Sequence, residues 1–220
     1  MRQQSGTRSP PATECPIVVQ LLLRIDAAEM IKAADRGLKD RLGQDIFPGA
    51  ITITEDPHRM RGHRSKPFDA EGLPNRRRAL IDSGVLTTWL LDLRSARQLG
   101  MHSTGHAARG TTSPPSPAAT NVWIEPGAAS PAELMADIAS GFYVTELMGM
   151  GVNGITGDYS RGAAGFWIEN GQLAFPVSEM TVAGNLKGMF ARLVAANDLE
   201  FRTGSDSPTL RIDDLTVAGA

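Results

Sequence analysis

The stretch that decides the fold runs from Gly141 to Asn185 and reads GFYVTELMGMGVNGITGDYSRGAAGFWIENGQLAFPVSEMTVAGN. It combines a strand pattern, a glycine-dense segment, a hairpin signal and a helix start. The glycine-dense segment runs from Gly149 to Gly165. Glycine is used where φ must be positive or where another backbone, a partner or a ligand comes close. We therefore expect a loop here, and loops on rigid scaffolds often carry function.

The surrounding sequence favours an α+β fold with mainly antiparallel, barrel-like sheet and a few packed helices. The Asn170-Gly171 dipeptide between two apolar runs is a strong hairpin signal, and Ser83-Gly84 is a second one. Ser130, Pro131 and Glu133 form a helix-start pattern, and Asn185 can cap another helix. Strands are expected at 17–23, 50–54, 79–82, 85–91, 122–125, 142–148, 166–169, 172–177, 209–212 and 215–217. Helices are expected at 26–42, at 95–99, from Ser130 to Gly141 and after Asn185. Strands outnumber helices and are joined by short turns, which is typical of this class.

The glycine-dense segment carries a compact polar set of candidate functional residues. Asp158 to Arg161 could bind a peptide terminus or a partner carboxylate, because an arginine can make bidentate contacts. An Asp-initiated turn with a surface arginine is an equal alternative. Glu146 is either partly buried and paired with an arginine or solvated. The candidate cleft or partner-binding residues are Glu146, Gly149, Gly151, Asn153, Gly154, Gly157, Asp158, Tyr159, Ser160, Arg161 and Gly162.

Two catalytic or cofactor interpretations of the same segment have little support. The residues from Gly149 to Gly154 fit G-x-G-x-x-G, but a dinucleotide site needs a helix to follow. Ser160 lacks the G-x-S-x-G context, and no histidine and acid partner can be assigned to it. A structural or partner-facing role is the better interpretation, and no catalytic residue is assigned.

The histidines make weak candidates for a metal site. His102 and His106 are four residues apart, but the glycines between and after them argue against a helix, and we expect a long surface loop at 102–119. Two ligands without a third ligand or a base make an incomplete zinc site. His58 and His63 are the other imidazoles available. We therefore expect no metal or cofactor in this chain. Cys15 is the single cysteine, which excludes an internal disulfide and fits a reducing cytoplasm.

Composition argues against nucleic-acid and membrane partners. The net charge is −2, and the arginine-rich run from Arg59 to Arg78 has a single aromatic residue, Phe68, and does not stand in a basic domain. A solvated loop or a surface for an acidic partner is the better interpretation of that run. The apolar run from Ile17 to Leu23 is too short to span a bilayer. The first sixteen residues are rich in Ser, Thr and Pro, so we expect a disordered tail at 1–16 and a folded domain at 17–220.

Several long blocks resemble the C-terminal domain of the TldD/PmbA family, also called modulators of DNA gyrase. They are GFYVTELMGMG, VNGITGDYSRGAAG and FWIENGQLAFPV between Gly141 and Val177, RSKPFDAEGLPNRRRALIDSGVLTTWLL at 64–91, TGHAARG at 104–110 and the C-terminal RTGSDSPTLRIDDLTVAGA. The similarity is greatest to the TldE (PmbA) branch. It implies a β-rich domain with a few helices, and because family members usually carry a further N-terminal domain, we expect this chain to correspond to their C-terminal part.

The resemblance implies a function through a partner. TldD-type subunits carry HExxxH and the catalytic zinc, whereas TldE-type subunits lack it, and no HExxxH occurs in this sequence. We therefore expect a non-catalytic TldE-like subunit that binds a zinc-carrying TldD-like partner in a cytoplasmic metalloprotease acting on peptides or unfolded proteins. Two alternatives stay open. The chain is itself a metallopeptidase with ligands drawn from its own histidines, or it is a truncated, inactive relative.

Overall fold

The computed structural model describes residues 13–19, 41–149, 151–154 and 156–219. They form two compact units, which are described separately. The first unit contains residues 13–19, 126–198 and 208–219, and the second contains residues 41–125 and 199–207.

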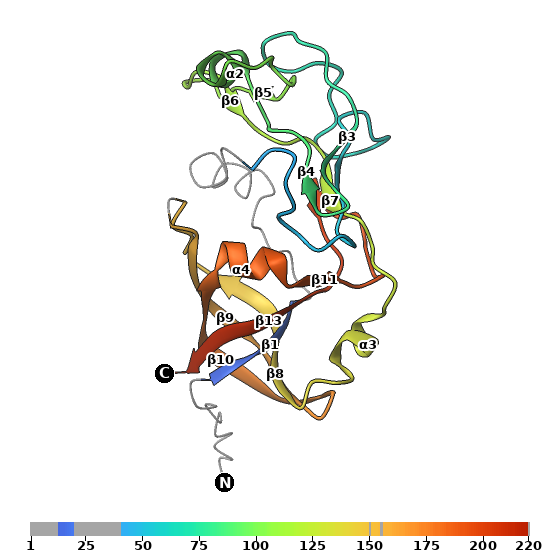
Figure 1. Cartoon of the computed structure of the whole chain (residues 1–220), viewed down its shortest axis with the longest axis vertical. Helices are drawn as coiled ribbons and strands as arrows, with labels where there is room; N and C mark the ends of the chain where they lie inside the picture. The colour runs from blue at the N-terminus through green and yellow to red at the C-terminus, as the bar shows by residue number, and fades with distance from the viewer. Residues whose placement is uncertain (1–12, 20–40, 150, 155, 220) are drawn as a thin grey trace. The chain divides into compact units, whose positions relative to one another are not determined.

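The first unit is a closed β-barrel (Figure 1). Its strand order is β1–β8–β9–β10–β13, and β13 also pairs with β1, which closes the barrel. The strands are β1 (Thr13–Val19), β8 (Ser140–Met148), β9 (Asp158–Glu169), β10 (Gln172–Asn185) and β13 (Leu210–Gly219), with β11 (Leu193–Ala195) added along β13. The β1–β8 pair is parallel and the other pairs of this sheet are antiparallel. The predicted α+β class with mainly antiparallel sheet is therefore confirmed.

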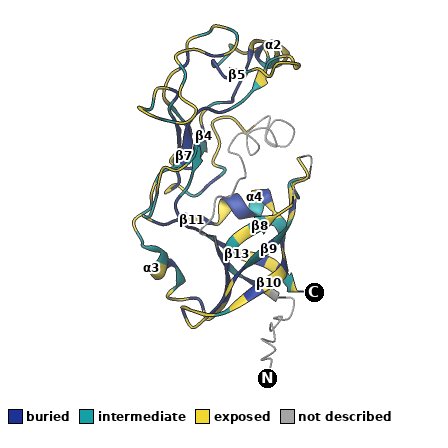
Figure 2. Ribbon diagram, turned by 180° about the vertical axis from the view of Figure 1, so that it is seen from behind, coloured by how far each residue is buried: buried dark blue, intermediate teal, exposed yellow. Residues whose placement is uncertain are grey.

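Buried and exposed residues alternate along the barrel strands, as Figure 2 shows. Inside the barrel, Phe142 stacks on Trp167 with 6.3 Å between the ring centroids. The largest of the other fully buried side chains on the barrel strands are Ile17, Ile168, Met180, Leu210, Ile212 and Leu215. The stability of this unit follows from these apolar contacts, since burial of one large apolar side chain is worth about 1.5–3 kcal/mol.

Local sequence signals fix the turns and helix starts of this unit. Asn170 and Gly171 have φ of 49° and 77°, as the predicted two-residue hairpin between β9 and β10 requires. Ser130 and Glu133 form the predicted capping box at the start of α3 (Pro131–Met135), which ends well before Gly141. Asn185 caps α4 (Leu186–Ala191), whose buried residues lie against the barrel at β10 and β13 (Figure 1).

The second unit contains a short mixed sheet and long, well-bonded loops. The strand order is β12–β7–β2–β3–β4, with β12 parallel to β7. The elements are β2 (Ile53–Glu55), β3 (Arg78–Asp82), β4 (Val85–Leu86), α2 (Leu93–Leu99), β5 (Ala107–Ala108), β6 (Ser116–Pro117), β7 (Val122–Ile124) and β12 (Ser205–Asp206). The predicted Ser83-Gly84 turn joins β3 to β4, and both residues have positive φ.

Two segments of the second unit differ from the prediction. The strand expected at 85–91 ends at Leu86, because the Leu91 N–H donates to the Thr104 hydroxyl at 2.7 Å instead of to a neighbouring strand. The surface loop expected at 102–119 is partly buried, since β5 and β6 pair within it and His106 is only 2% exposed. Contacts with distant residues, which local composition does not reveal, cause both differences.

The N-terminal prediction also needs correction. The sequence predicts a disordered tail at 1–16, but residues 13–16 belong to β1, where Cys15 pairs with Leu215. The thiol of Cys15 is therefore not incidental to the fold, and burial raises its pKa to about 11. Residues 1–12 and 20–40, with most of the helix predicted at 26–42, lie outside the described residues. The strands predicted at 209–212 and 215–217 are one strand, β13.

Among the helices of the described residues, none has the length and apolarity that crossing a membrane requires.

Candidate functional site

The residues predicted to line a cleft or face a partner lie around the turn between β8 and β9. The predicted loop at Gly149–Gly165 is only partly correct, because Asp158 already begins β9. A Cβ at Gly165 would lie 2.0 Å from the Tyr143 carbonyl oxygen. Glycine at 165 therefore allows β8 and β9 to approach each other. The residue is needed for the pairing of two strands and not for the flexibility of a loop.

The turn itself is held against the start of β9. The Ser160 N–H donates to the Gly151 carbonyl at 2.7 Å, and a Cβ at Gly151 would lie 1.5 Å from the Ser160 carbonyl oxygen. Val152 bridges Tyr159 in the antiparallel sense. A strand therefore follows the G-x-G-x-x-G pattern, so the helix N-terminus that a dinucleotide site requires is absent from the described residues here.

A network of polar hydrogen bonds holds the part of this turn that leads into β9. The Asp158 carboxylate accepts from the Thr156 hydroxyl at 2.6 Å and from the Asn185 amide at 3.1 Å. These two hydrogen bonds, that from Thr156 first, lower the pKa of Asp158. Asn185 also donates to the Thr156 carbonyl, and the Asn153 carbonyl accepts from the Gly157 N–H. The hydrogen bond between Asn185 and Asp158, which are 27 residues apart in the sequence, thus ties the turn to the start of α4.

The polar set at 158–161 divides between the two faces of β9. Asp158 and Ser160 are exposed, whereas Tyr159 is 3% exposed on the opposite face, which Arg161 shares by strand alternation. Burial raises the pKa of the Tyr159 hydroxyl, and the charge and hydrogen bond of Arg161 oppose this shift. The four residues therefore do not form a single binding cluster.

The remaining predicted residues surround these two faces. Glu146 is exposed opposite Ala164 beyond a bulge in β8, which agrees with the solvated alternative. Gly149 and Gly157 adopt positive φ, Gly154 is exposed in the turn, and Gly162 lies within β9 against Met148.

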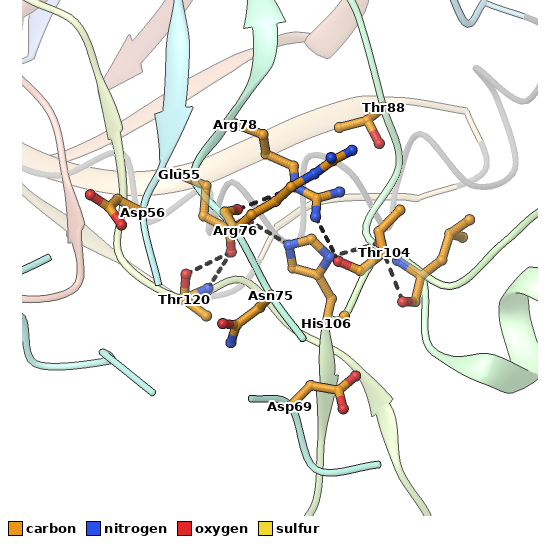
Figure 3. A network of polar contacts seen from close by, with 12 residues as sticks. Glu55, Asp56, Asp69, Asn75, Arg76, Arg78, Thr88, Thr104, His106 and Thr120 are labelled. Carbon is orange, nitrogen blue, oxygen red and sulfur yellow. Dashed lines mark hydrogen bonds and ion pairs between the residues drawn. The ribbon is translucent and has the colours of Figure 1, made fainter. Parts of the chain in front are cut away.

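A second polar cluster lies in the second unit, and its central residues Glu55, His106 and Thr120 are buried (Figure 3). Glu55, at the end of β2, contacts His106 with 2.5 Å between Oε2 and Nε2. Its other oxygen accepts from the Thr120 N–H at 2.6 Å and from the Thr120 hydroxyl at 2.9 Å. On the far side of the imidazole, Nδ1 lies 2.7 Å from the Thr104 hydroxyl. Both ring nitrogens of His106 are therefore engaged within the protein.

The electrostatics of this cluster favour an ionised carboxylate. Burial alone would raise the pKa of Glu55, but the hydrogen bond and charge of His106 and the two bonds from Thr120 outweigh it, so the pKa is lowered. Arg78 donates to the Thr104 carbonyl at 2.8 Å. Its pKa is lowered by burial, although the charge of Glu55 acts in the opposite direction.

Backbone contacts fix His106 from both sides. Gly105 adopts φ of 75°, and a Cβ there would lie 2.6 Å from the Pro74 carbonyl oxygen. The Ala107 N–H donates to the buried Asp69 carboxylate at 3.1 Å. The same carboxylate accepts from the backbone N–H groups of Glu71 and Leu73. The cluster thus links the arginine-rich loop to β2 and β5.

The two histidines with i, i+4 spacing are not brought together for metal binding. His102 is exposed, whereas His106 is buried with both nitrogens bonded. Within the described residues, no group of three or more His, Cys, Asp and Glu side chains is arranged to hold a metal ion. His102 and His106 therefore do not form the paired metal ligands that their spacing suggested. Sequence reasoning missed Glu55 as the partner of His106, and no local pattern marks it.

The arginine-rich loop has aromatic neighbours that the sequence did not show. The Arg59 guanidinium lies 3.8 Å from the Phe201 ring centroid, and Phe201 meets Trp123 edge-on at 5.4 Å. Arg77 lies 5.8 Å from the Trp123 ring centroid. Arg78, in contrast, points inward to the Glu55 cluster and does not belong to the solvated set (Figure 3).

Comparisons with known proteins agree with this architecture. The family model for the PmbA/TldA metallopeptidase C-terminal domain matches residues 17–219. The chain is 45% identical over 183 residues to metalloprotease PmbA of Escherichia coli O157:H7, which covers 83% of this chain and 39% of that protein. The chain thus spans about two fifths of the length of this curated relative.

Solved structures share the fold. A crystal structure of a Thermotoga maritima protein, named as a candidate modulator of DNA gyrase, superposes with a TM-score of 0.81 at 30% identity, covering 96% of this chain and 51% of that one. The structure of TldE from Thermococcus kodakarensis has a TM-score of 0.81 at 23% identity over the same shares, and it supports the fold alone.

Proposed function

This chain belongs to the PmbA/TldA metallopeptidase family through its C-terminal domain, and from this membership we propose that it is the TldE-like, non-catalytic part of a zinc metalloprotease. In this proposal a TldD-like partner contributes the zinc and the hydrolytic centre. The substrates are peptides or unfolded protein segments, and the complex is cytoplasmic.

One observation carries the proposal: the buried environment of His106. A zinc-binding histidine needs a ring nitrogen free to face the metal, usually with the other nitrogen held by a second residue. In His106 one nitrogen contacts Glu55 and the other contacts Thr104, and only 2% of the residue is exposed. The absence of HExxxH from the sequence also supports a zinc site in the partner and not in this chain.

We assign the β8–β9 turn to the side of the domain that meets the partner or its substrate. The turn is hydrogen-bonded to Asn185 and to β9, yet it exposes Val152 and Met148, which are 37% and 45% exposed. A turn held by such hydrogen bonds and carrying exposed apolar side chains suits a binding surface, since less conformational entropy is lost when a partner is bound.

The test is reconstitution with a TldD-like protein from the same cells. The affinity-tagged chain is expressed with that protein and purified, and zinc content and peptide hydrolysis are measured for the complex and for each component. We expect a stable complex in which zinc and chelator-sensitive hydrolysis depend on the partner's HExxxH motif. The variant H102Q, at an exposed position of this chain, should leave the zinc content of the complex unchanged.

Two outcomes would count against the proposal. Stoichiometric zinc in the isolated chain, lost in H106Q or in H102Q, would favour a metallopeptidase in its own right. Failure of the two proteins to assemble would remove the subunit role.

A further inference from the structure

Arg161 has an unusual position for a charged side chain. Tyr159, Ala163 and Trp167 are all buried, so alternate residues of β9 face the inside of the barrel, and Arg161 follows the same alternation. Its partner across the sheet is Val182, which is 3% exposed. The arginine therefore extends along an apolar face near the end of the barrel where Asn185 begins α4.

The guanidinium of Arg161 is incompletely bonded. One terminal nitrogen donates to the Leu147 carbonyl at 3.3 Å, which is a long hydrogen bond. The Nε atom is buried and has no hydrogen-bond partner among the described residues. A buried polar group without a partner is destabilising, and such a group in a native protein calls for an explanation.

The charge of Arg161 is also uncompensated by the carboxylates described. No ion pair joins it to an Asp or Glu in the described part of the chain. Asp158, the nearest acid in sequence, is bonded instead to Thr156 and Asn185. Arg211 of the same unit is compensated in the usual way, since its guanidinium forms ion pairs with the carboxylates of both Asp137 and Asp213.

The stem of Arg161 is nevertheless held in place. A Cβ at Gly151 would lie 3.4 Å from its Cγ, so the β8–β9 turn lies directly against the side chain. Tyr159 lies two residues away on the same face and interacts with the guanidinium. A positioned cation with an unmet N–H and no counter-ion is an arrangement suited to receive an anion.

We propose that Arg161 binds the C-terminal carboxylate of a peptide at this end of the barrel. A guanidinium presents paired N–H groups that match the two oxygens of a carboxylate, and its single charge matches that of one carboxylate. The choice of a peptide, and not another carboxylic acid, depends on the proposed function. The carboxylate site itself does not depend on assembly with a partner, so it can be tested on the chain alone.

The experiment titrates the full chain with acetyl-tetraalanine as the free acid and as the C-terminal amide, using calorimetry. We expect the free acid to bind at least about tenfold more tightly than the amide, because a charge-assisted bond is lost in the amide. An acetylated peptide with an internal aspartate and an amidated C-terminus separates a side-chain carboxylate from a terminal one. Equal binding of this peptide and the free acid would overturn the assignment to the terminus.

Three variants locate the site. R161M should lose the preference for the free acid, and R161K should reduce it, because lysine keeps the charge without the paired N–H groups. R192M is the matched control, since Arg192 is an exposed arginine of the same unit in a surface ion pair with Asp214. Preference for the free acid that persists in R161M, or that is lost equally in R192M, would overturn the proposal, as would failure of both peptides to bind.

A stability measurement separates binding from a purely structural role. Arg161 is partly exposed, its Nε has no partner and it makes no ion pair among the described residues, so R161M should keep the thermal midpoint unchanged or raise it. A midpoint lowered as much as by a core truncation would show that the arginine supports the fold, and would overturn the proposal. Because neither measurement involves a TldD-like protein, failure here is distinguishable from failure of the proposed function.

Discussion

Glu55 and His106 lie 51 residues apart in the sequence, and their side chains meet at 2.5 Å in the interior of the second unit. Glu55 is 0% and His106 2% exposed. Thr120 and Thr104 complete the hydrogen bonds at the two ends of the pair. The contacts of this buried pair link the end of β2 to the segment that leads into β5 and to the segment that leads into β7.

Glu55→Gln should destabilise the protein strongly. An amide keeps the shape of the carboxylate but removes its charge, so the charge-assisted hydrogen bonds to His106 and Thr120 are lost. Breaking a buried pair from one side typically costs about 3–5 kcal/mol. Urea unfolding at neutral pH measures the loss, and Glu200→Gln, in an exposed ion pair with Arg202, is the control that should have little effect. A Glu55→Gln variant as stable as wild type would contradict the structure.

The same carboxylate should produce a dependence of stability on pH. The pKa of Glu55 is lower in the folded than in the unfolded protein, so its stabilising contribution is present above the unfolded pKa and is lost as the pH falls through the folded one. We expect this loss below about pH 4.5, the ordinary value for the group. The difference in unfolding free energy between wild type and Glu55→Gln, measured from pH 7 to pH 3, should shrink in that range. A constant difference would exclude an ionised Glu55.

His106 and Glu55 should show strong energetic coupling. His106→Gln removes the same contact from the other side, so the double variant should be less destabilised than the sum of the two single variants. Coupling of about 0.5–3 kcal/mol is usual for side chains in direct contact. His102→Gln, at an exposed position, serves as the control and should be neutral. Strict additivity of Glu55→Gln and His106→Gln would argue against their contact.

Two glycines of β9 should respond differently to the same substitution. At Gly165 a new Cβ would lie 2.0 Å from the Tyr143 carbonyl, which forces β8 and β9 apart. At Gly162 the nearest atom would be Met148 Cβ at 3.5 Å, an ordinary contact. Gly165→Ala should therefore unfold or severely destabilise the barrel, while Gly162→Ala should keep its thermal midpoint within a few degrees. Similar midpoints for the two variants would contradict the described pairing of β8 and β9.

The capping box of α3 should contribute modestly. Ser130→Ala removes the hydroxyl that accepts from the Glu133 N–H, and the expected cost is about 1 kcal/mol. Glu133→Gln retains a side-chain acceptor for the Ser130 N–H and should cost less. Denaturant midpoints of the two variants provide the comparison. A larger loss for Glu133→Gln would mean that charge, and not the cap geometry, is the stabilising factor.

The parts of the fold that sequence predicted correctly are governed by neighbouring residues. The Asn170-Gly171 and Ser83-Gly84 turns depend on positive φ at those positions, and the helix starts at Ser130 and Asn185 depend on side chains that bond within three residues. Such interactions are complete within a few residues of chain, so the local pattern determines them. The resemblance of the long blocks between Gly141 and Val177 to one family was equally a property of sequence alone, and the family match at 17–219 confirmed it.

Tertiary structure decided where those elements meet and which polar groups become buried. The sequence indicated a tail at Cys15, a loop at Gly165, a surface segment at His106 and a polar cluster at Arg161. In the folded chain Cys15 pairs with Leu215, Gly165 accommodates Tyr143, His106 meets Glu55 and Arg161 turns away from Asp158. Each of these outcomes depends on a strand or side chain distant in sequence, whose packing and desolvation outweigh the local preference of the residue.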